Sequence, residues 1–114
     1  SYEIKKDYQD VVQQLIKAWR RFPTGTYALW YPVVSRLRID EMERALVRSG
    51  IKNIQLFESG ISPDSEEHGM TASGMIVINP PWTLWKAMET TLPLLTEWLS
   101  NGQGHFRQLQ LVAE

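Results

Sequence analysis

The sequence predicts an α/β fold, because helical and extended patterns alternate along its 114 residues. Apolar residues recur at steps of three and four in three stretches, which predicts amphipathic helices at 7–22, 35–49 and 83–100. Short apolar runs between them predict strands at 26–31, 52–57, 74–78 and 105–112. The runs at 26–31 and 74–78 are typical of strands buried on both faces, as in parallel sheets, whereas the run at 105–112 has a mixed character. We expect residues 1–114 to form a single α/β unit with helices on both faces of a sheet.

Local signals predict where these elements end. Asp7 is suited to cap the first helix, and Pro23 with Gly25 to end it. Pro32 is expected to end the strand at 26–31, and Pro93 to kink the third helix. The stretch 59–73 is polar, contains proline and glycine and shows no helical period, so we expect a loop there.

That loop predicts how the strands run. A helix joins the strands at 26–31 and 52–57, which favours a parallel crossover between them. The strands at 52–57 and 74–78 have no helix between them, which favours antiparallel pairing. The predicted sheet thus combines parallel strands with one antiparallel strand. Ligands of open α/β sheets bind beyond the carboxyl ends of the parallel strands. The carboxyl end of 74–78 should therefore lie at the opposite edge.

This direction decides between two interpretations of Asn79-Pro80-Pro81-Trp82. The motif is similar to the [Asp/Asn]-Pro-Pro-aromatic motif of amino-group methyltransferases, in which oxygen acceptors orient the amino group and the ring stacks on the base. The alternative is a strand-to-helix turn, with the prolines starting the helix and Trp82 packing beneath it. Because the motif should lie at the far edge, we favour the turn.

Composition excludes several classes of function. The chain has no cysteine, which excludes disulfides, thiolate catalysis and cysteine zinc sites, and a reducing compartment fits. His68 and His105 are too far apart in sequence to form a metal pair at helical spacing. No apolar run approaches the length of a membrane span. The net charge is −1, but residues 17–52 carry eight basic residues against three acidic ones. This segment could bind RNA, or its charges could simply be solvated helix faces.

Several longer blocks carry a specific resemblance. They are residues 2–5, 22–34, 37–50 and 69–82, and the most specific are Thr24–Val34 (TGTYALWYPVV) and Gly69–Trp82 (GMTASGMIVINPPW). On these blocks the chain resembles the C-terminal part of the bacterial large-subunit ribosomal RNA adenine-N6 methyltransferases of the J type. The resemblance implies a class I, Rossmann-like sheet, with the strand at 74–78 inserted antiparallel between the two preceding strands.

The resemblance also implies a chemistry and the residues that perform it. In that family S-adenosylmethionine is the donor, ribosomal RNA the substrate, and methyl passes directly to adenine N6. The catalytic Asp-Pro-Pro-Tyr precedes the first helix. Tyr2 would be its aromatic residue and hold the adenine, whereas Ser1 stands where the second proline belongs. The aspartate, the first proline and the donor-binding half are absent here, so we expect this chain alone to be inactive. The resemblance implies a cytoplasmic protein.

Further candidate residues lie at the expected ligand edge. Trp30 and Tyr31 could flank the base or the donor, although aromatics at a strand end are often core. His68, Met70 and Thr71 lie on the loop and could contact the substrate. The pairs Arg20–Arg21 and Arg36–Arg38 could hold phosphates.

A second function remains open from the residues. The chain could be a non-catalytic α/β module that binds RNA or a partner protein. A large exposed apolar face beside residues 1–31 would count against such a self-sufficient module.

Overall fold

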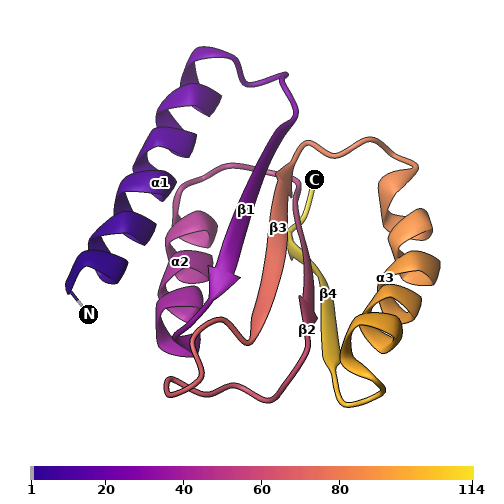
Figure 1. Ribbon diagram of the computed structural model, residues 1–114. Helices are drawn as coiled ribbons and strands as arrows, with labels where there is room; N and C mark the ends of the chain where they lie inside the picture. The colour runs from indigo at the N-terminus through magenta and orange to yellow at the C-terminus, as the bar shows by residue number, and fades with distance from the viewer. Residues whose placement is uncertain (1) are drawn as a thin grey trace.

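The computed structural model describes residues 2–114, and the side chains of residues 5–114. A four-stranded sheet lies between two helical layers (Figure 1). The elements in chain order are α1 (Tyr2–Arg21), β1 (Tyr27–Val33), α2 (Arg36–Arg48), β2 (Ile54–Gly60), β3 (Ala72–Ile78), α3 (Leu84–Ser100) and β4 (His105–Val112). Helices α1 and α2 lie on one face of the sheet, and α3 lies on the other beside β2 and β4 (Figure 1). None of the described helices is both long enough and apolar enough to cross a bilayer.

The sheet differs from the predicted one. Its order is β1-β3-β2-β4, and every pair of neighbouring strands is antiparallel. The prediction of a parallel, Rossmann-like sheet is therefore wrong. Strands β1 and β2 do run in the same direction, since each is antiparallel to β3, and β3 lies between them as the family resemblance implies. The helical linker determines the relative direction of two strands, and it does not make them neighbours.

The antiparallel pairing of β3 with β2 is as predicted, with Ile54 opposite Ile78 and Gly60 opposite Ala72. Strand β4 pairs with the other side of β2 and forms one outer edge of the sheet. Strand β1 forms the other outer edge. The two outer strands of the sheet, β1 and β4, therefore differ in composition. One comes from the N-terminal part of the chain and the other from its C-terminal end.

Three local predictions also need correction. Helix α1 begins at Tyr2, so Asp7 lies inside the helix and does not cap it. Pro32 lies within β1, because an edge strand does not need every backbone donor. Strand β1 is not buried on both faces: Ala28 and Trp30 are exposed, since α3 does not reach over β1.

The main core lies between the sheet and the α1–α2 layer. Ile39 and Leu46 of α2 are fully buried against the sheet, together with Leu56 of β2 and Ile76 of β3. A smaller cluster joins α3 to the opposite face through Phe57, Val77 and Leu92. The stripe of α2 is as predicted, because its apolar residues recur at the period of a helix that has a single sheet to cover.

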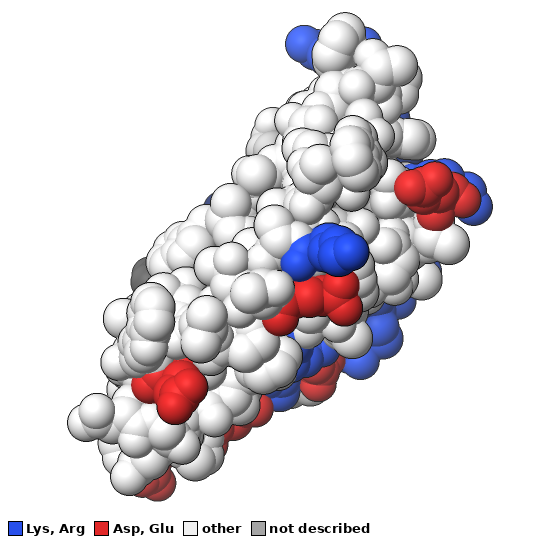
Figure 2. Space-filling view, turned by 90° about the vertical axis from the view of Figure 1, so that its right-hand side faces the viewer, with Lys and Arg blue, Asp and Glu red and all other residues white. Residues whose placement is uncertain are grey.

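The outer side of α3 is more exposed than its pattern predicts. Leu95 and Leu99 belong to the apolar pattern of this helix, but they are 40% and 62% exposed. Trp82 was expected to pack beneath the helix and is 93% exposed. Figure 2 shows this side of the molecule, where charged side chains are scattered over a mostly uncharged surface. An apolar helical stripe wider than the sheet surface beneath it leaves its flanks in solvent.

Gly74 provides a stringent test of the packing between β1 and β3. It lies opposite Tyr31, and a Cβ atom at Gly74 would come within 2.4 Å of the Tyr31 ring. We expect Gly74→Ala to lower the free energy of unfolding by about 1–3 kcal/mol, because the buried tyrosine must shift. Urea denaturation measures this, with Ser73→Ala as the control. Equal stability of the two variants would contradict the close contact.

Candidate functional site

The carboxyl ends of β1 and β2 lie at the same end of the sheet, which is the carboxyl edge. A buried carboxylate there bonds side chains from the surrounding elements. Glu58 of β2 is fully buried. Its Oε1 and Oε2 accept hydrogen bonds from the two terminal nitrogens of Arg36, at 2.9 and 2.8 Å. The Tyr31 hydroxyl donates to Oε1 at 2.8 Å. Such a bidentate arginine pair is the geometry that best compensates a buried carboxylate.

The cluster extends from Glu58 to the neighbouring elements. Arg107 of β4 donates to Glu58 at 3.3 Å and to Glu43 of α2 at 3.1 Å. Arg36 also donates through Nε to Asp64 at 2.9 Å. Asp64 belongs to the loop between β2 and β3, so this bond holds the loop against the start of α2. The edge is therefore fixed by ion pairs among α2, β2, β4 and the loop, together with the hydrogen bond from Tyr31 of β1.

These contacts determine the protonation states at the edge. Burial alone would raise the pKa of Glu58, but hydrogen bonds from Arg36 and Tyr31 outweigh it and hold the pKa below its ordinary value. Burial and the adjacent Glu58 carboxylate raise the pKa of Tyr31. The hydrogen bond from Arg36 lowers the pKa of Asp64. At neutral pH, Glu58 is ionised and Tyr31 is a neutral donor.

The two candidate aromatics of β1 are separated by the sheet. Tyr31 is buried in the α1–α2 face, where it bonds Glu58. Trp30 points to the opposite face and is 56% exposed, opposite Met75 of β3. Neighbouring residues of a strand point to opposite faces, so the two rings lie on opposite sides of the sheet, although both residues contribute to the lining of the cavity beside β1.

The loop candidates also differ in exposure. Thr71 is buried, and its backbone N–H donates to the Val33 carbonyl at 3.0 Å, which closes the end of β1. His68 and Met70 are exposed on the loop. They therefore lie at the carboxyl edge in contact with solvent, which is the position that a substrate-contacting residue needs.

Asn79 lies at the opposite edge of the sheet, as predicted, because Ile78 pairs with the first residues of β1 and β2. Its side-chain nitrogen donates to the Thr24 carbonyl at 3.0 Å. Its own carbonyl accepts from the Thr26 hydroxyl at 2.8 Å, and its N–H donates to Asn53 at 2.9 Å. These bonds tie the end of β3 to the segments that precede β1 and β2.

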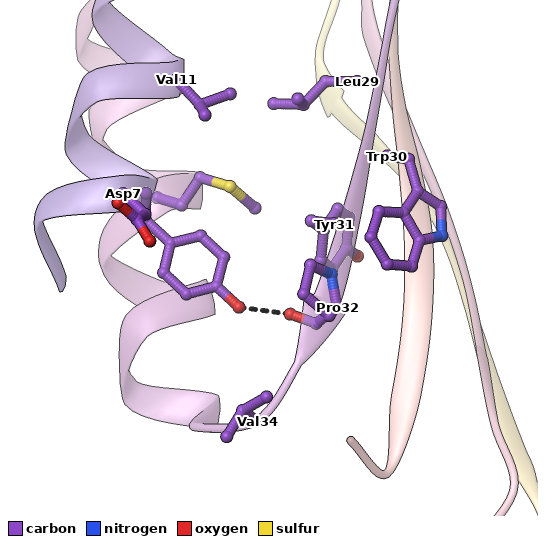
Figure 3. A pocket seen from close by; sticks show the side chains of 9 residues that line it. Asp7, Val11, Leu29, Trp30, Tyr31, Pro32 and Val34 are labelled. Atoms are coloured by element: carbon purple, nitrogen blue, oxygen red, sulfur yellow. Dashed lines mark hydrogen bonds between the residues drawn. The ribbon is translucent and has the colours of Figure 1, made fainter. Parts of the chain in front are cut away.

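The predicted catalytic residue lies at the limit of the structure. Tyr2 is the first residue of α1, and its side chain lies outside the described residues. One helical turn later, α1 and β1 enclose a cavity of about 200 Å³ (Figure 3). Val11 and Leu29 face each other across it, and the Tyr8 hydroxyl donates to the Pro32 carbonyl. The cavity wall is apolar apart from Asp7.

The candidate phosphate-binding arginines either pair with nearby acidic residues or lie at the end of a helix. Arg36 is engaged with Glu58 and Asp64, and Arg38 pairs with Glu41 at 3.2 Å. Arg20 and Arg21 lie in the last turn of α1, where positive charge also stabilises the helix dipole. The basic segment is therefore partly explained by the fold.

The sequence analysis did not single out Glu58 or Arg107. A signal for Glu58 was present, because it is the one charged residue in the apolar strand Ile54–Gly60 (IQLFESG). A carboxylate on such a strand must find cationic partners when the strand is buried. No signal paired it with Arg107, which lies 49 positions later and approaches only through the β2–β4 pairing.

Sequence comparison identifies the family. Residues 1–112 match the family described as "Ribosomal RNA large subunit methyltransferase D, RlmJ". The chain belongs to this family. It is similar to the ribosomal RNA large subunit methyltransferase J of Escherichia coli (strain K12), with 48% identity over 99% of this chain and 41% of the relative. It is 50% identical to the protein of the same name from Haemophilus influenzae, over 86% of this chain and 35% of the relative.

The fold has a counterpart among solved structures. The crystal structure of protein LPL1258 from Legionella pneumophila aligns with a TM-score of 0.81 and 28% identity, over 96% of this chain and 40% of that one. The chain thus spans about two fifths of the length of the Escherichia coli relative and of this solved structure, and 35% of the Haemophilus influenzae relative. The resemblance noted in the sequence is confirmed, and so is the expectation that the relatives are longer.

The depression beside the Glu58 cluster does not by itself fit S-adenosylmethionine, the donor that the family name implies. The open depression beside the Glu58 cluster has a volume of about 380 Å³. It is lined by Pro63 and by charged or imidazole side chains, so it lacks the apolar wall on which an adenine ring packs. Two of these side chains, Arg36 and Arg107, already bond Glu58. The residues that line this depression therefore do not form a binding site for the donor.

The Glu58 cluster predicts an acid-sensitive fold. Because the folded pKa of Glu58 lies below its ordinary value, the ionised carboxylate stabilises the fold at pH values above about 4, the ordinary glutamate pKa. This stabilisation is lost as the pH falls through the folded pKa. Glu58→Gln leaves two arginines without their buried partner, so we expect a loss of about 3–5 kcal/mol at pH 7. Urea denaturation at pH 7 and pH 3 measures both effects.

The matched control is Glu66→Gln on the exposed loop. It should keep the stability at pH 7 and the acid sensitivity of the unchanged chain. If Glu58→Gln were as stable as this control at pH 7, the cluster would not hold the edge together.

Proposed function

We propose that this chain is the C-terminal part of an S-adenosylmethionine-dependent methyltransferase that methylates adenine N6 of ribosomal RNA in the cytoplasm. The observation that carries the proposal is the family match over residues 1–112, combined with about 48% identity to a named ribosomal RNA methyltransferase. When bound, the donor supplies the methyl group. Most of its binding site is expected in the part of the longer relatives that this chain does not cover.

In this proposal the chain contributes one wall of the substrate site. The start of α1 carries Tyr2, which would stack on the target adenine. His68 and Met70 are our candidates for contact with RNA, since both are exposed on the loop at the carboxyl edge. Tyr31 and Thr71 are buried and hold that edge in shape. Tyr31 does so by its hydrogen bond to Glu58, and Thr71 by its hydrogen bond to the Val33 carbonyl.

The alternative of a self-sufficient binding module is disfavoured by the surface. Trp30 of β1 is 56% exposed, and Met75 beside it is 37% exposed. Val11 of α1 is 41% exposed on the other side of β1. A self-sufficient module would be expected to cover such apolar side chains next to a sheet edge.

Activity distinguishes the two functions. We expect the chain alone to transfer no methyl group to ribosomal RNA. A fusion that places the upstream portion of the Escherichia coli relative before Tyr2 adds the segment in which the resemblance implies the catalytic aspartate and prolines, and it should be active. The measurement is transfer of radiolabelled methyl from S-adenosylmethionine to unmodified ribosomal RNA. Activity of the chain alone, or inactivity of a well-folded fusion, would contradict the proposal.

Tyr2 is tested in the same fusion. Stacking of a base on an aromatic ring contributes about 1–3 kcal/mol, so Tyr2→Ala should lower the rate of methyl transfer by roughly 5- to 150-fold. Tyr2→Phe keeps the ring and should retain most of the activity. If the two variants lost activity to the same extent, stacking would not be the role of Tyr2.

A further inference from the structure

The cations at the two ends of the sheet differ in whether they are paired. At the carboxyl edge, Arg36 and Arg107 are both bonded to carboxylates. The far edge, where β1 and β2 begin and β3 ends, is formed by segments 17–27, 48–54 and 78–86. These segments contain no acidic residue and six basic ones, which are Lys17, Arg20, Arg21, Arg48, Lys52 and Lys86. All six are exposed, and none forms an ion pair with another residue that the structure describes.

Trp82 is presented at this far edge by a fixed turn. Its side chain is 93% exposed. Asn79 is held by the hydrogen bonds described above, and Pro80 and Pro81 restrict the backbone that follows it. The Pro81 carbonyl then accepts a hydrogen bond from the N–H of Leu84 at 3.0 Å. Because a ring this exposed buries little apolar area, its contribution to the stability of the fold does not account for a tryptophan at this position.

Phe22 provides a second exposed ring, at the end of α1. Its side chain is 62% exposed. One side of the ring rests on Gly25, where a Cβ atom would come within 2.7 Å of it. The Phe22 carbonyl accepts a hydrogen bond from the Tyr27 hydroxyl at 2.7 Å, which fixes the backbone. The ring is therefore held from one side and open to solvent on the other.

The rings and the cations belong to one surface. The bond of 3.0 Å between Asn79 and the Thr24 carbonyl joins the turn after α1 to the turn before α3. Figure 1 shows these two turns at the same end of the molecule. The N–H of Asn79 donates to Asn53, which places Lys52 beside them. The acidic residue at this end is Glu114, which follows the Ala113 carbonyl that bonds Asn53.

We propose that this far-edge surface, formed by Arg20, Arg21, Phe22, Lys52 and Trp82, is a second binding site for the RNA substrate and takes an unpaired segment remote from the target adenine. The exposed rings stack on unpaired bases, and the free cations hold the phosphates. Since β1 spans seven residues, this surface lies roughly 20 Å from the carboxyl edge. The inference rests on the proposed function, because that function makes RNA the partner.

Charge favours RNA over a protein segment as the occupant. The loop at the carboxyl edge carries Asp64, Glu66 and Glu67, which oppose the approach of phosphates. Within the described part of the chain, the unpaired cations gather at the far edge instead. An apolar protein segment would cover the two rings and leave these cations without partners, whereas single-stranded RNA offers a base and a phosphate in every nucleotide.

Binding of an oligouridylate tests this site apart from the catalytic one. A fluorescent oligouridylate of about 12 nucleotides contains no adenine and is long enough to span such a surface. In the fusion described above, Trp82→Ala should lower its affinity roughly 5- to 150-fold, the range for the loss of one base–aromatic stack. Trp98→Ala is the control, since Trp98 is 74% exposed at the other end of α3. Fluorescence anisotropy measures both, and equal affinities would overturn the proposal.

Two further results decide what the surface binds. Trp82→Phe keeps an aromatic ring and should stay within about 3-fold of the unchanged affinity. Circular dichroism verifies that each variant is folded. A fusion that does not bind the oligouridylate would overturn the proposal. If the chain alone still bound it, a segment of the longer chain would be the occupant of the surface.

The salt dependence of binding tests the cations. Each phosphate contact on a single strand contributes about 0.7 to the slope of log affinity against log salt concentration, so Arg20→Ala combined with Arg21→Ala should lower that slope by about 1.4. Arg44→Ala removes an exposed cation from the middle of α2 and should leave the slope unchanged. A decrease of about 0.7 for every arginine removed, Arg44 included, would indicate diffuse binding and overturn the proposal.

The second site and the proposed function can fail separately. In the fusion, Arg20→Ala combined with Arg21→Ala should raise KM for ribosomal RNA at least about 5-fold and keep kcat, because the reaction takes place at the other edge. Methyl transfer with an unchanged KM in this variant would retain the function and contradict the second site. Binding of the oligouridylate through Trp82 by a fusion that transfers no methyl group would contradict the function and retain the site.

Discussion

The need to neutralise one buried carboxylate governs the architecture. Glu58 is fully buried in the middle of the sheet, so its charge must be balanced by cations held at hydrogen-bonding distance. Arg36 and Arg107 provide that balance from α2 and β4, and Tyr31 adds a third donor from β1. The same arginines bind Asp64 and Glu43, which fixes the loop and α2. The carboxyl edge keeps its shape because none of these groups can move without leaving another unpaired.

A rigid edge of this kind suits a protein that supplies only part of a catalytic site. The loop around His68, which would touch RNA in the proposed function, is held against α2 by the bond between Arg36 and Asp64. The chemistry itself is expected from the longer chain of the family, since the depression beside the Glu58 cluster does not fit the donor. The exposed apolar side chain of Trp30 on the edge strand β1 is consistent with this division.

The sequence identified the elements better than their arrangement. Helices at 35–49 and 83–100 and the final strand were placed within a residue or two, because helical periodicity and terminal glycine or asparagine act locally. The parallel sheet was wrong, since neither a linker nor an apolar pattern specifies which strands become neighbours. Trp82 was also misplaced, because local periodicity cannot show whether the surface next to a helix is wide enough to cover a side chain.

By itself, the sequence determined the family, the positions of most elements and the location of Asn79 at the far edge, because these depend on contiguous blocks and on local direction. Only the tertiary structure decided that β4 pairs with the far side of β2, that Tyr31 and Trp30 serve opposite faces, and that Glu58 joins Arg36 to Arg107. The physical reason is sequence distance. A buried charge requires partners, but the chain can bring them from any position that the strand order makes adjacent.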